Sequence, residues 1–245
     1  MSGVMLITGG SRGIGAATAR LAAERGYSVC INYVRNGDAA QKLVGELGKK
    51  ALAVQADVGS EAEVLRLFKT VDEKLGRLAV LVNNAGIVDR SSRVEAMSAE
   101  RIQRMLAINV TGSFLCAREA VKRMSTRHGG NGGAIVNVSS MAAKLGGSGD
   151  YVDYAASKGA IDTLTVGLAR EVGAEGIRVN GVRPGVIRTE IHATSGDPAR
   201  AERIGAAAPL QRAGEAEEVA RTILWLASGE ASYITGALLD VSGGR

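Results

Sequence analysis

A short apolar segment that runs directly into a glycine-rich loop is the feature that most constrains the fold of this chain. Val4 to Thr8 predicts a strand buried on both faces, and the loop Thr8 to Gly15 follows it. A helix is predicted next, from Ala16 to Arg25. Strand, glycine loop and helix in this order are typical of a dinucleotide-binding unit, because the glycines let a pyrophosphate approach the positive end of the helix. Packing alone can also produce such a loop, so this segment does not settle the function by itself.

Predicted strands and helices alternate along the rest of the chain. Strands are predicted at 29–33, 51–55, 80–83, 134–138, 178–183 and 238–241, and helices at 38–47, 60–75, 98–123, 154–172 and 215–228. Such alternation indicates right-handed βαβ crossovers and a parallel sheet. We therefore expect an α/β fold, a Rossmann doubly wound parallel sheet of about seven strands with helices on both faces.

The length and composition favour one domain over residues 1–245. The chain has 245 residues, 46% of them hydrophobic and only 3% aromatic, which suits an aliphatic core. From Glu190 to Pro209 the residues are small and polar without periodicity, so we expect a substrate lid within about 190–209.

Two local motifs carry structural predictions. Ser60-Glu61-Ala62-Glu63 predicts a capping box at the start of a helix. Asn109-Val110-Thr111-Gly112 interrupts the long helix 98–123 with poor helix formers, which predicts a kink. The kink is either a packing irregularity or a sign that Asn109 has a polar role inside the protein.

The charge and the few cysteines and histidines restrict the partners. The net charge of +5 makes an anionic ligand plausible, whereas the scattered basic residues argue against a nucleic-acid partner. Two cysteines and two histidines predict neither a disulfide framework nor a metal site. No apolar run approaches the ~20 residues of a membrane span, so we expect no membrane partner and a cytoplasmic location.

The end of the second predicted strand bears on the choice of cofactor. An acidic residue there would bind the adenosine ribose and select NAD. Here the strand ends in Asn32-Tyr33, Arg35 follows, and Arg12 lies in the glycine loop. Two guanidinium groups near that position favour NADP by binding its 2′-phosphate, and NAD stays possible if both arginines are merely solvated.

Tyr154 and Lys158 form the candidate reacting pair. Residues four apart share one face of a helix, so the ammonium is expected to lower the pKa of the phenol toward the working pH. Such a phenol can exchange a proton with a carbonyl or an alcohol as hydride moves. Ser140 follows the strand 134–138 and can face the same crevice. Each residue taken alone is equally compatible with a solvated helix face or turn.

Taken together, these segments resemble the short-chain dehydrogenase/reductase family over the whole chain, most of all bacterial 3-oxoacyl-carrier-protein reductases and glucose or sugar dehydrogenases. The motifs that carry the resemblance are Thr8 to Gly15, Asn83 to Gly86, Asn109, Ser140 with Tyr154 and Lys158, and Pro184-Gly185 with Thr189. The resemblance implies an NADP(H)-dependent oxidoreductase acting on a carbonyl/secondary alcohol pair.

The resemblance also implies a role for each site residue. Tyr154 would be the acid/base, Ser140 would bind the substrate oxygen, Lys158 would bind the nicotinamide ribose, and Asn109 would hold a water that relays protons. The remaining positions would contact the cofactor: Gly9, Ser11, Arg12, Gly13, Ile14, Gly15, Asn32, Tyr33, Arg35, Asp57, Val58, Asn84, Ala85, Gly86, Pro184, Gly185, Ile187 and Thr189.

The chain departs from the family pattern in ways that affect the substrate. The spacing from Ser140 to Tyr154 is one residue longer than usual, so Ser139 is an alternative. Glu175 stands where carrier-protein reductases commonly have a basic residue, which weighs against an acyl-carrier substrate. Polar residues expected near the mouth favour a small polar molecule such as a sugar: Asp89, Arg90, Lys144, Asp150, Tyr151 and His192.

Two alternatives and an assembly complete the expectations. One alternative is a 3-oxoacyl-carrier-protein reductase, and the other is a non-catalytic NADP-binding regulator, which would not need the Tyr154–Lys158 pair. The family resemblance implies a homotetramer packed through the helices Thr111 to Met124 and Tyr154 to Val172 and through the C-terminal strand.

Overall fold

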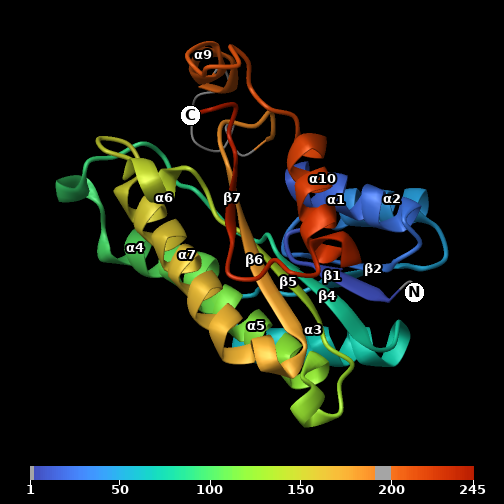
Figure 1. Cartoon of the computed structure of the whole chain (residues 1–245). Helices are drawn as coiled ribbons and strands as arrows, with labels where there is room; N and C mark the ends of the chain where they lie inside the picture. Colours follow the sequence, from blue (N-terminus) through green and yellow to red (C-terminus); the bar gives the residue numbers. More distant parts are fainter. Residues whose placement is uncertain (1–2, 191–199) are drawn as a thin grey trace.

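The computed structural model describes residues 3–190 and 200–245. Within them, seven parallel strands form one sheet in the order β3-β2-β1-β4-β5-β6-β7, which confirms the predicted doubly wound α/β fold (Figure 1). The strand order reverses between β1 and β4, and ligands of such sheets bind at the carboxyl ends near this point. The strands are β1 (Val4–Ile7), β2 (Ser28–Tyr33), β3 (Ala51–Gln55), β4 (Leu78–Asn83), β5 (Gly133–Val138), β6 (Ile177–Pro184) and β7 (Leu238–Val241).

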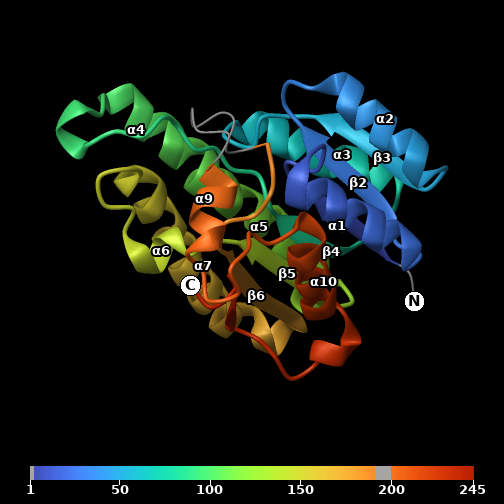
Figure 2. The same cartoon turned by 90° about the horizontal axis from the view of Figure 1, so that it is seen from above.

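Helices cover both faces of the sheet, as Figures 1 and 2 show. One face carries α1 (Gly13–Glu24), α2 (Gly37–Leu47) and α10 (Ala216–Ala227). The other carries α3 (Glu61–Lys74), α5 (Gly112–Met124) and α7 (Val152–Val172). The shorter elements are α4 (Ala99–Leu106), α6 (Ala142–Leu145), α9 (Arg200–Ala206), the π-helical turn η2 (Ala107–Thr111) and the 3₁₀ turns η1 (Val94–Ala96), η3 (Thr126–His128), η4 (Gly173–Glu175) and η5 (Gly229–Ala231).

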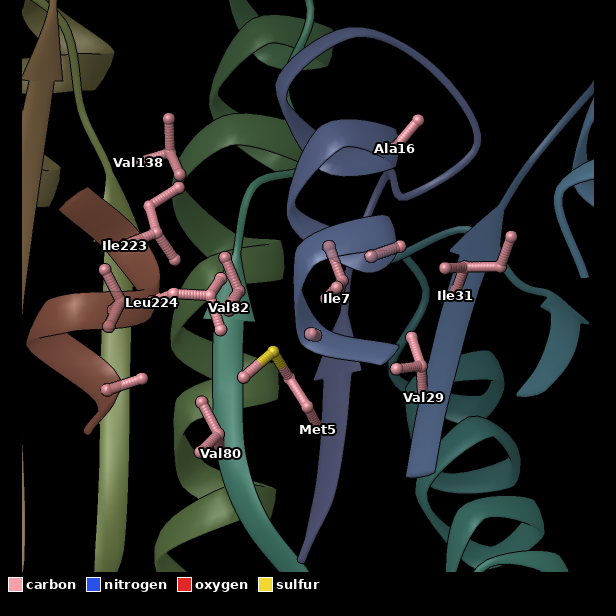
Figure 3. Close-up of a cluster of buried hydrophobic side chains, with 14 of the residues drawn as sticks. Met5, Ile7, Ala16, Val29, Ile31, Val80, Val82, Val138, Ile223 and Leu224 are labelled. Atoms are coloured by element: carbon pink, nitrogen blue, oxygen red, sulfur yellow. The ribbon is translucent and has the colours of Figure 1, made fainter. Parts of the chain in front are cut away.

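Each strand contributes apolar side chains to both layers of helices. In β1, Met5 and Ile7 lie in the core beneath α1 and α10, whereas Val4 and Leu6 lie in the core formed with α3 and α5. Figure 3 shows the first core, where strand residues meet Ile223 and Leu224 of α10. Burial of both sheet faces explains why the strands read as continuous apolar runs, and it holds the strand ends in fixed relative positions.

The predicted capping box at Ser60 is wrong in its bonds. Ser60 precedes α3, but its side chain accepts no cap hydrogen bond. Its backbone N–H already donates to the Asp57 carbonyl (3.0 Å), and the Glu63 carboxylate accepts from the Asp57 backbone N–H instead (2.8 Å). A reciprocal capping box occurs at the start of α10, between Glu215 and Glu218. The turn after β3 therefore takes the Ser60 N–H donor and the Glu63 carboxylate acceptor that the pattern assigned to the capping box.

The interruption of the long helix is a π-helical turn, Ala107–Thr111, between α4 and α5. Asn109 lies in this turn and is fully buried. Such turns often occur at functional sites. Of the two readings of the kink, the structure agrees with a polar role for Asn109.

Part of the predicted lid, residues 191–199 including His192, lies outside the described residues. The described remainder of the predicted lid includes α9, whose Ala201 packs with Val186 and Ala213 in a small apolar cluster. This part is therefore helical rather than irregular. Across the ranges 3–190 and 200–245, no helix combines the length and apolarity needed to cross a membrane.

Candidate active site

The carboxyl ends of β1, β4, β5 and β6 bring the predicted site segments together. Neighbouring parallel strands end at the same edge of a sheet, so the glycine loop, Asn84 to Gly86, Ser139-Ser140 and the segment after Pro184 converge there. The Asn84 amide donates to the carbonyls of Thr8 and Gly9, both at 2.9 Å. These bonds connect the end of β4 to the glycine loop.

Contacts that only glycine allows shape the loop. A Cβ at Gly9 would lie 2.9 Å from the Cα of Ala85, and one at Gly15 would lie 2.6 Å from the Gly9 carbonyl oxygen. Gly13 has φ +50°, and a Cβ there would lie 3.2 Å from the Thr189 methyl. We call the concave backbone of residues 9–15 the glycine cradle.

The start of α1 suits an anionic ligand. Its N-cap residue, Arg12, makes no side-chain cap bond, and the first turn contains no acidic residue. Helix N-termini leave backbone N–H groups unpaired and carry positive partial charge, which a phosphate can satisfy. Ser11 lies in the cradle, and Ile14 packs against the core beneath it. The residues therefore fit the pyrophosphate of a dinucleotide.

At the expected adenosine end, the Asn32 side chain is engaged within the protein. This side chain is buried: its oxygen accepts from the Gly9 N–H (3.2 Å), and its amide donates to the Ala56 carbonyl (2.7 Å). It therefore ties the glycine cradle to the residue that follows β3. The sequence shows an uncharged amide at this position, but it does not predict the hydrogen-bond partners, which lie more than 20 residues away.

The two arginines expected to select NADP lie at the surface. Arg35 is exposed and follows Tyr33, which is partly buried. Arg12 forms an ion pair with Glu190 (2.9 Å), and both side chains are more than half exposed. Glu190 directly follows Thr189, so the pair joins the glycine cradle to the segment after β6.

The turn after β3 is held by its own backbone. The Asp57 carboxylate accepts from the Gly59 N–H (2.9 Å), and Val58 is buried against Gly112, where a Cβ would lie 2.7 Å from its methyl. Asp57 is partly exposed at the sheet edge. The turn can thus present a carboxylate and backbone groups toward an adenine.

The segment after β6 is fixed on two sides. The Gly185 N–H donates to the Val241 carbonyl (2.9 Å), and the Pro184 carbonyl accepts from the Met141 N–H (2.9 Å). Ile187 is buried and forms a parallel bridge with Gly214. This rigid support places Thr189 beside Gly13.

Ser140, rather than Ser139, meets the candidate phenol. The Ser140 side chain is hydrogen-bonded to the phenol of Tyr154, and its oxygen also accepts from the Ala142 N–H (3.1 Å). Ser139 is buried, and its hydroxyl donates to the Lys158 carbonyl (3.1 Å). Despite the extra residue between the two segments, Ser140 and not Ser139 therefore lies at the phenol.

The predicted lowering of the Tyr154 pKa is wrong, because the net shift is upward. Burial raises the pKa of Tyr154, and the hydrogen bond with Ser140 only partly opposes it. The Lys158 ammonium lies 5.7 Å from the phenol ring centre and donates to the Val138 carbonyl (2.7 Å). Burial lowers the pKa of Lys158 to about 8, against the charge of Asp162. The spacing of Tyr154 and Lys158 predicts that the two side chains lie close together, but it does not predict the free-energy cost of burying the phenolate.

Asn109 anchors the segment that leaves Gly86. Its oxygen accepts from the Ile87 N–H (2.8 Å), and its amide donates to the Ile87 carbonyl and the Ser157 hydroxyl, both at 3.0 Å. A Cβ at Gly86 would lie 3.4 Å from the Asn109 oxygen and 3.5 Å from the Lys158 nitrogen. An added methyl at Gly86 would therefore contact both groups without a clash.

Two supporting residues were missed from the sequence. The Thr8 hydroxyl accepts from the N–H groups of Asn84 and Ala85, both at 3.0 Å. The Ser157 hydroxyl receives the Asn109 amide and donates to the Tyr154 carbonyl (2.7 Å). A hydroxyl residue at a strand end and one beside Tyr154 were the available signals, but hydroxyl residues are common at both positions.

Several polar residues that informed the substrate prediction are engaged within the protein. Asp150 accepts from the Ser91 hydroxyl (2.6 Å), and Lys144 pairs with Asp240 (2.5 Å). Glu175 is buried and paired with Ser125 and Arg127, and it precedes the amino end of β6, away from the candidate site. Its charge is paired within the protein, and position 175 offers no basic group to an acidic carrier.

The described side chains include no cluster of three or more His, Cys, Asp or Glu residues that could hold a metal ion. Cys30 and Cys116 are both buried, and burial raises the pKa of each thiol to about 12. Neither thiol has the lowered pKa of a reactive cysteine.

Comparison with known proteins places the chain among oxidoreductases. A family model described as "Enoyl-(Acyl carrier protein) reductase" matches residues 9–245. The uncharacterized oxidoreductase YgfF of Escherichia coli K12 is 57% identical over 245 residues, covering 99% of each chain. A 3-oxoacyl-[acyl-carrier-protein] reductase of Synechocystis is 40% identical over 98% of this chain and 96% of its own.

A solved structure shares the fold over nearly its whole length. The 3-ketoacyl-(acyl-carrier-protein) reductase from Brucella melitensis, complexed with NADH, has a TM-score of 0.92 and 32% identity. The match covers 99% of this chain and 97% of that one.

Proposed function

Because the chain belongs to the short-chain dehydrogenase/reductase family of oxidoreductases, we propose that it transfers a hydride between NADP(H) and a carbonyl/secondary alcohol pair. The observation that carries this proposal is the convergence of Ser140, Tyr154 and Lys158 at the strand ends beside the glycine cradle. A nicotinamide bound along that edge supplies or accepts the hydride.

Tyr154 acts as the acid in the reducing direction. Its raised pKa keeps the phenol protonated at neutral pH, so it can donate a proton to a carbonyl oxygen. The Ser140 hydroxyl, already at the phenol, donates a second hydrogen bond to the same oxygen and stabilises the charge that develops there. The pKa direction therefore supports carbonyl reduction.

Lys158 and Asn109 supply the phenol with protons. The ammonium of Lys158, with a pKa of about 8, changes charge near neutral pH and can also bind a ribose hydroxyl. This ammonium and the Asn109 oxygen both lie near Gly86. A water held there would connect Lys158 with Asn109.

NADP is the proposed cofactor because β2 ends without an acidic residue and two arginines are near the expected adenosine position. Both Arg12 and Arg35 have accessible side chains. Binding a 2′-phosphate would require Arg12 to exchange its Glu190 partner for the phosphate. The Brucella melitensis relative is described with NADH, so NAD is the alternative to be tested.

The proposed substrate is a small polar carbonyl compound such as a sugar. Asp89 and Arg90 are polar residues of the segment that leaves Gly86, and Arg90 is exposed. The alternative is a 3-oxoacyl-carrier-protein substrate. Its support is the activity for which the Synechocystis and Brucella melitensis relatives are named.

A substrate panel with both cofactors tests the function. Sugars, short ketones and 3-oxoacyl thioesters would be mixed with NADPH or NADH, and the nicotinamide absorbance would be followed. We expect turnover with NADPH and at least one carbonyl. Tight NADPH binding without turnover on any carbonyl or alcohol would instead support a non-catalytic regulator.

We also propose that the single domain 1–245 assembles as a homotetramer through α5, α7 and β7. Phe114 of α5 is half exposed, which supports a contact along that helix. Light scattering would give the expected mass of four chains, and a monomer would contradict this assembly.

A further inference from the structure

A nearly buried ion pair lies one residue before Tyr154. Arg101 of α4 donates from Nε to one oxygen of Asp153 (2.8 Å) and from Nη2 to the other (3.3 Å). The side chains are only 13% and 3% exposed. A two-pronged arginine–carboxylate pair fixes orientation as well as distance, unlike the exposed pairs elsewhere on this surface.

The same pair connects the first turn of α7 with the segment 87–92 that follows Gly86. Arg101 Nη1 donates to the Arg90 carbonyl (2.8 Å), and the Asp153 carboxylate accepts from the Tyr154 backbone N–H (2.9 Å). The Ser92 N–H donates to the Asp150 carbonyl (2.9 Å), close to the ion pair. Asn109 already holds the other end of this segment at Ile87.

We propose that Arg101 is a positioning residue: through Asp153 and the Arg90 carbonyl, it holds the Tyr154 phenol in register with the segment 87–92 that borders the substrate. The inference rests on the proposed function, because it assigns Arg101 a role in the proton transfer by Tyr154. Losing the pair would let the first turn of α7 shift against that segment. A displacement of about 1 Å at reacting groups can lower turnover by about 10²-fold.

The pair also controls the charge next to the phenol. Lys158 and Asp153 flank Tyr154 on its own helix, Arg101 reaches Asp153 from α4, and Asp89 and Tyr151 interact with Arg101. Ser140 contributes a neutral hydroxyl from the end of β5. Without the Arg101 charge, the Asp153 carboxylate one residue from Tyr154 would disfavour ionisation of the phenol.

The test compares Arg101→Met with Arg104→Met, which removes an arginine of the same charge from the exposed side of the same helix. For Arg101→Met we expect kcat to fall about 10- to 100-fold on a substrate found in the panel, while the cofactor Kd changes less than about twofold. Arg101→Lys should recover part of kcat, because lysine keeps the positive charge but cannot make the two-pronged contact with the carboxylate. Arg104→Met should behave as the wild type.

A second measurement does not depend on catalysis. The absorbance of each protein, minus that of the same protein carrying Tyr154→Phe, gives the titration of this phenol alone. We expect a higher midpoint in Arg101→Met and a return toward the wild-type midpoint in Arg101→Met/Asp153→Asn. If the wild type proves inactive, the proposed function fails, and this titration still decides the role of Arg101.

Two results would overturn the proposal. One is a folded Arg101→Met protein with wild-type kcat or, where no substrate is found, with an unchanged phenol midpoint. The other is a loss of cofactor affinity as large as the loss of kcat, which would indicate general loosening. If Arg101→Met does not fold, Asp153→Asn serves in its place, since it keeps an oxygen for the Tyr154 N–H, and wild-type turnover in that variant would refute the proposal.

Discussion

The two ends of the candidate cofactor site are built in different ways. At the reacting end, Lys158 and Asn109 are buried, and hydrogen bonds of 2.7 to 3.0 Å fix their polar atoms. At the adenosine end, Arg12 and Arg35 lie at the surface, and the visible partner of Arg12 is an equally exposed carboxylate. Proton transfer depends on fixed geometry, whereas recognition of a phosphate tolerates a flexible arginine. Substitutions at the first end should therefore affect turnover, and those at the second should affect the choice of cofactor.

The largest effect should follow removal of the phenolic hydroxyl. Tyr154→Phe takes away the proposed acid while keeping the ring that packs near Lys158. We expect kcat to fall by about 10²- to 10⁴-fold with little change in cofactor Kd. Steady-state assays would measure kcat, and a fluorescence titration with the cofactor would measure its Kd.

Tyr233→Phe is the matched control, because that hydroxyl is fully exposed and lies after η5. It should leave kcat unchanged. If Tyr154→Phe keeps wild-type turnover on the same substrate, the phenol is not the acid, and the division between the two ends loses its basis.

Burial of Lys158 should make folding stability depend on pH. Its pKa falls from 10.5 to about 8 on folding, so the unfolded chain binds this proton more tightly. The free energy of unfolding therefore decreases by on the order of 3 kcal/mol as the pH falls from about 10.5 to 8. Below pH 8 it changes little through this group. Lys158→Met removes this dependence. Between pH 8 and pH 10.5, the unfolding free energy of the wild type should therefore rise relative to that of the variant.

Urea unfolding at several pH values would measure the difference. Lys69→Met is the control, since its side chain is 76% exposed and its ammonium stays in water in both states. Parallel curves for wild type and Lys158→Met between about pH 8 and 10 would mean that the Lys158 ammonium is solvated after all.

Cofactor selectivity should respond to the exposed arginines. Arg12→Ala with Arg35→Ala removes two groups that can bind a 2′-phosphate, and each charged hydrogen bond contributes about 1.5 to 3 kcal/mol. We expect NADP affinity to weaken about 10- to 100-fold more than NAD affinity, with kcat nearly kept.

Glu190→Gln is the counterpart, because it frees Arg12 from its ion pair without removing the guanidinium. NADP affinity should rise by about threefold, as suits an exposed pair. Equal losses of NADP and NAD in the arginine variant would show that neither arginine reads the phosphate.

The smallest effect should come from adding a methyl group at Gly86. In Gly86→Ala, the new methyl would lie 3.4 Å from the Asn109 oxygen and 3.5 Å from the Lys158 nitrogen, so the fold can accommodate it. A methyl cannot reproduce the hydrogen bonds of a displaced water, so the proton path would be weakened and we expect kcat to fall by about 10-fold. Gly45→Ala has open space around it and serves as the control. Unchanged turnover in Gly86→Ala would exclude a proton path beside this residue.

Much of the fold could be predicted because its signals are local. Buried parallel strands require continuous apolar runs, and the predicted ranges 51–55 and 238–241 match β3 and β7. The glycine loop could be recognised because a tight turn and close backbone contacts leave no alternative residue. The roles of Asn32 and Ser60 could not be predicted, since their hydrogen-bond partners lie in other segments or in a competing turn.

The sequence by itself determined the order of the strands along the chain, the apolar runs and glycines that make them a doubly wound sheet, and which side chains carry chemistry. Only the tertiary structure decided the state of those side chains. Burial raises the phenol pKa of Tyr154 that the Tyr–Lys spacing predicts to fall, and the contact with Ser140 distinguishes that serine from Ser139. The pairing of Arg101 with Asp153 crosses 52 positions of the chain. Desolvation and long-range contacts depend on the whole folded surroundings of a residue, and no local pattern encodes them.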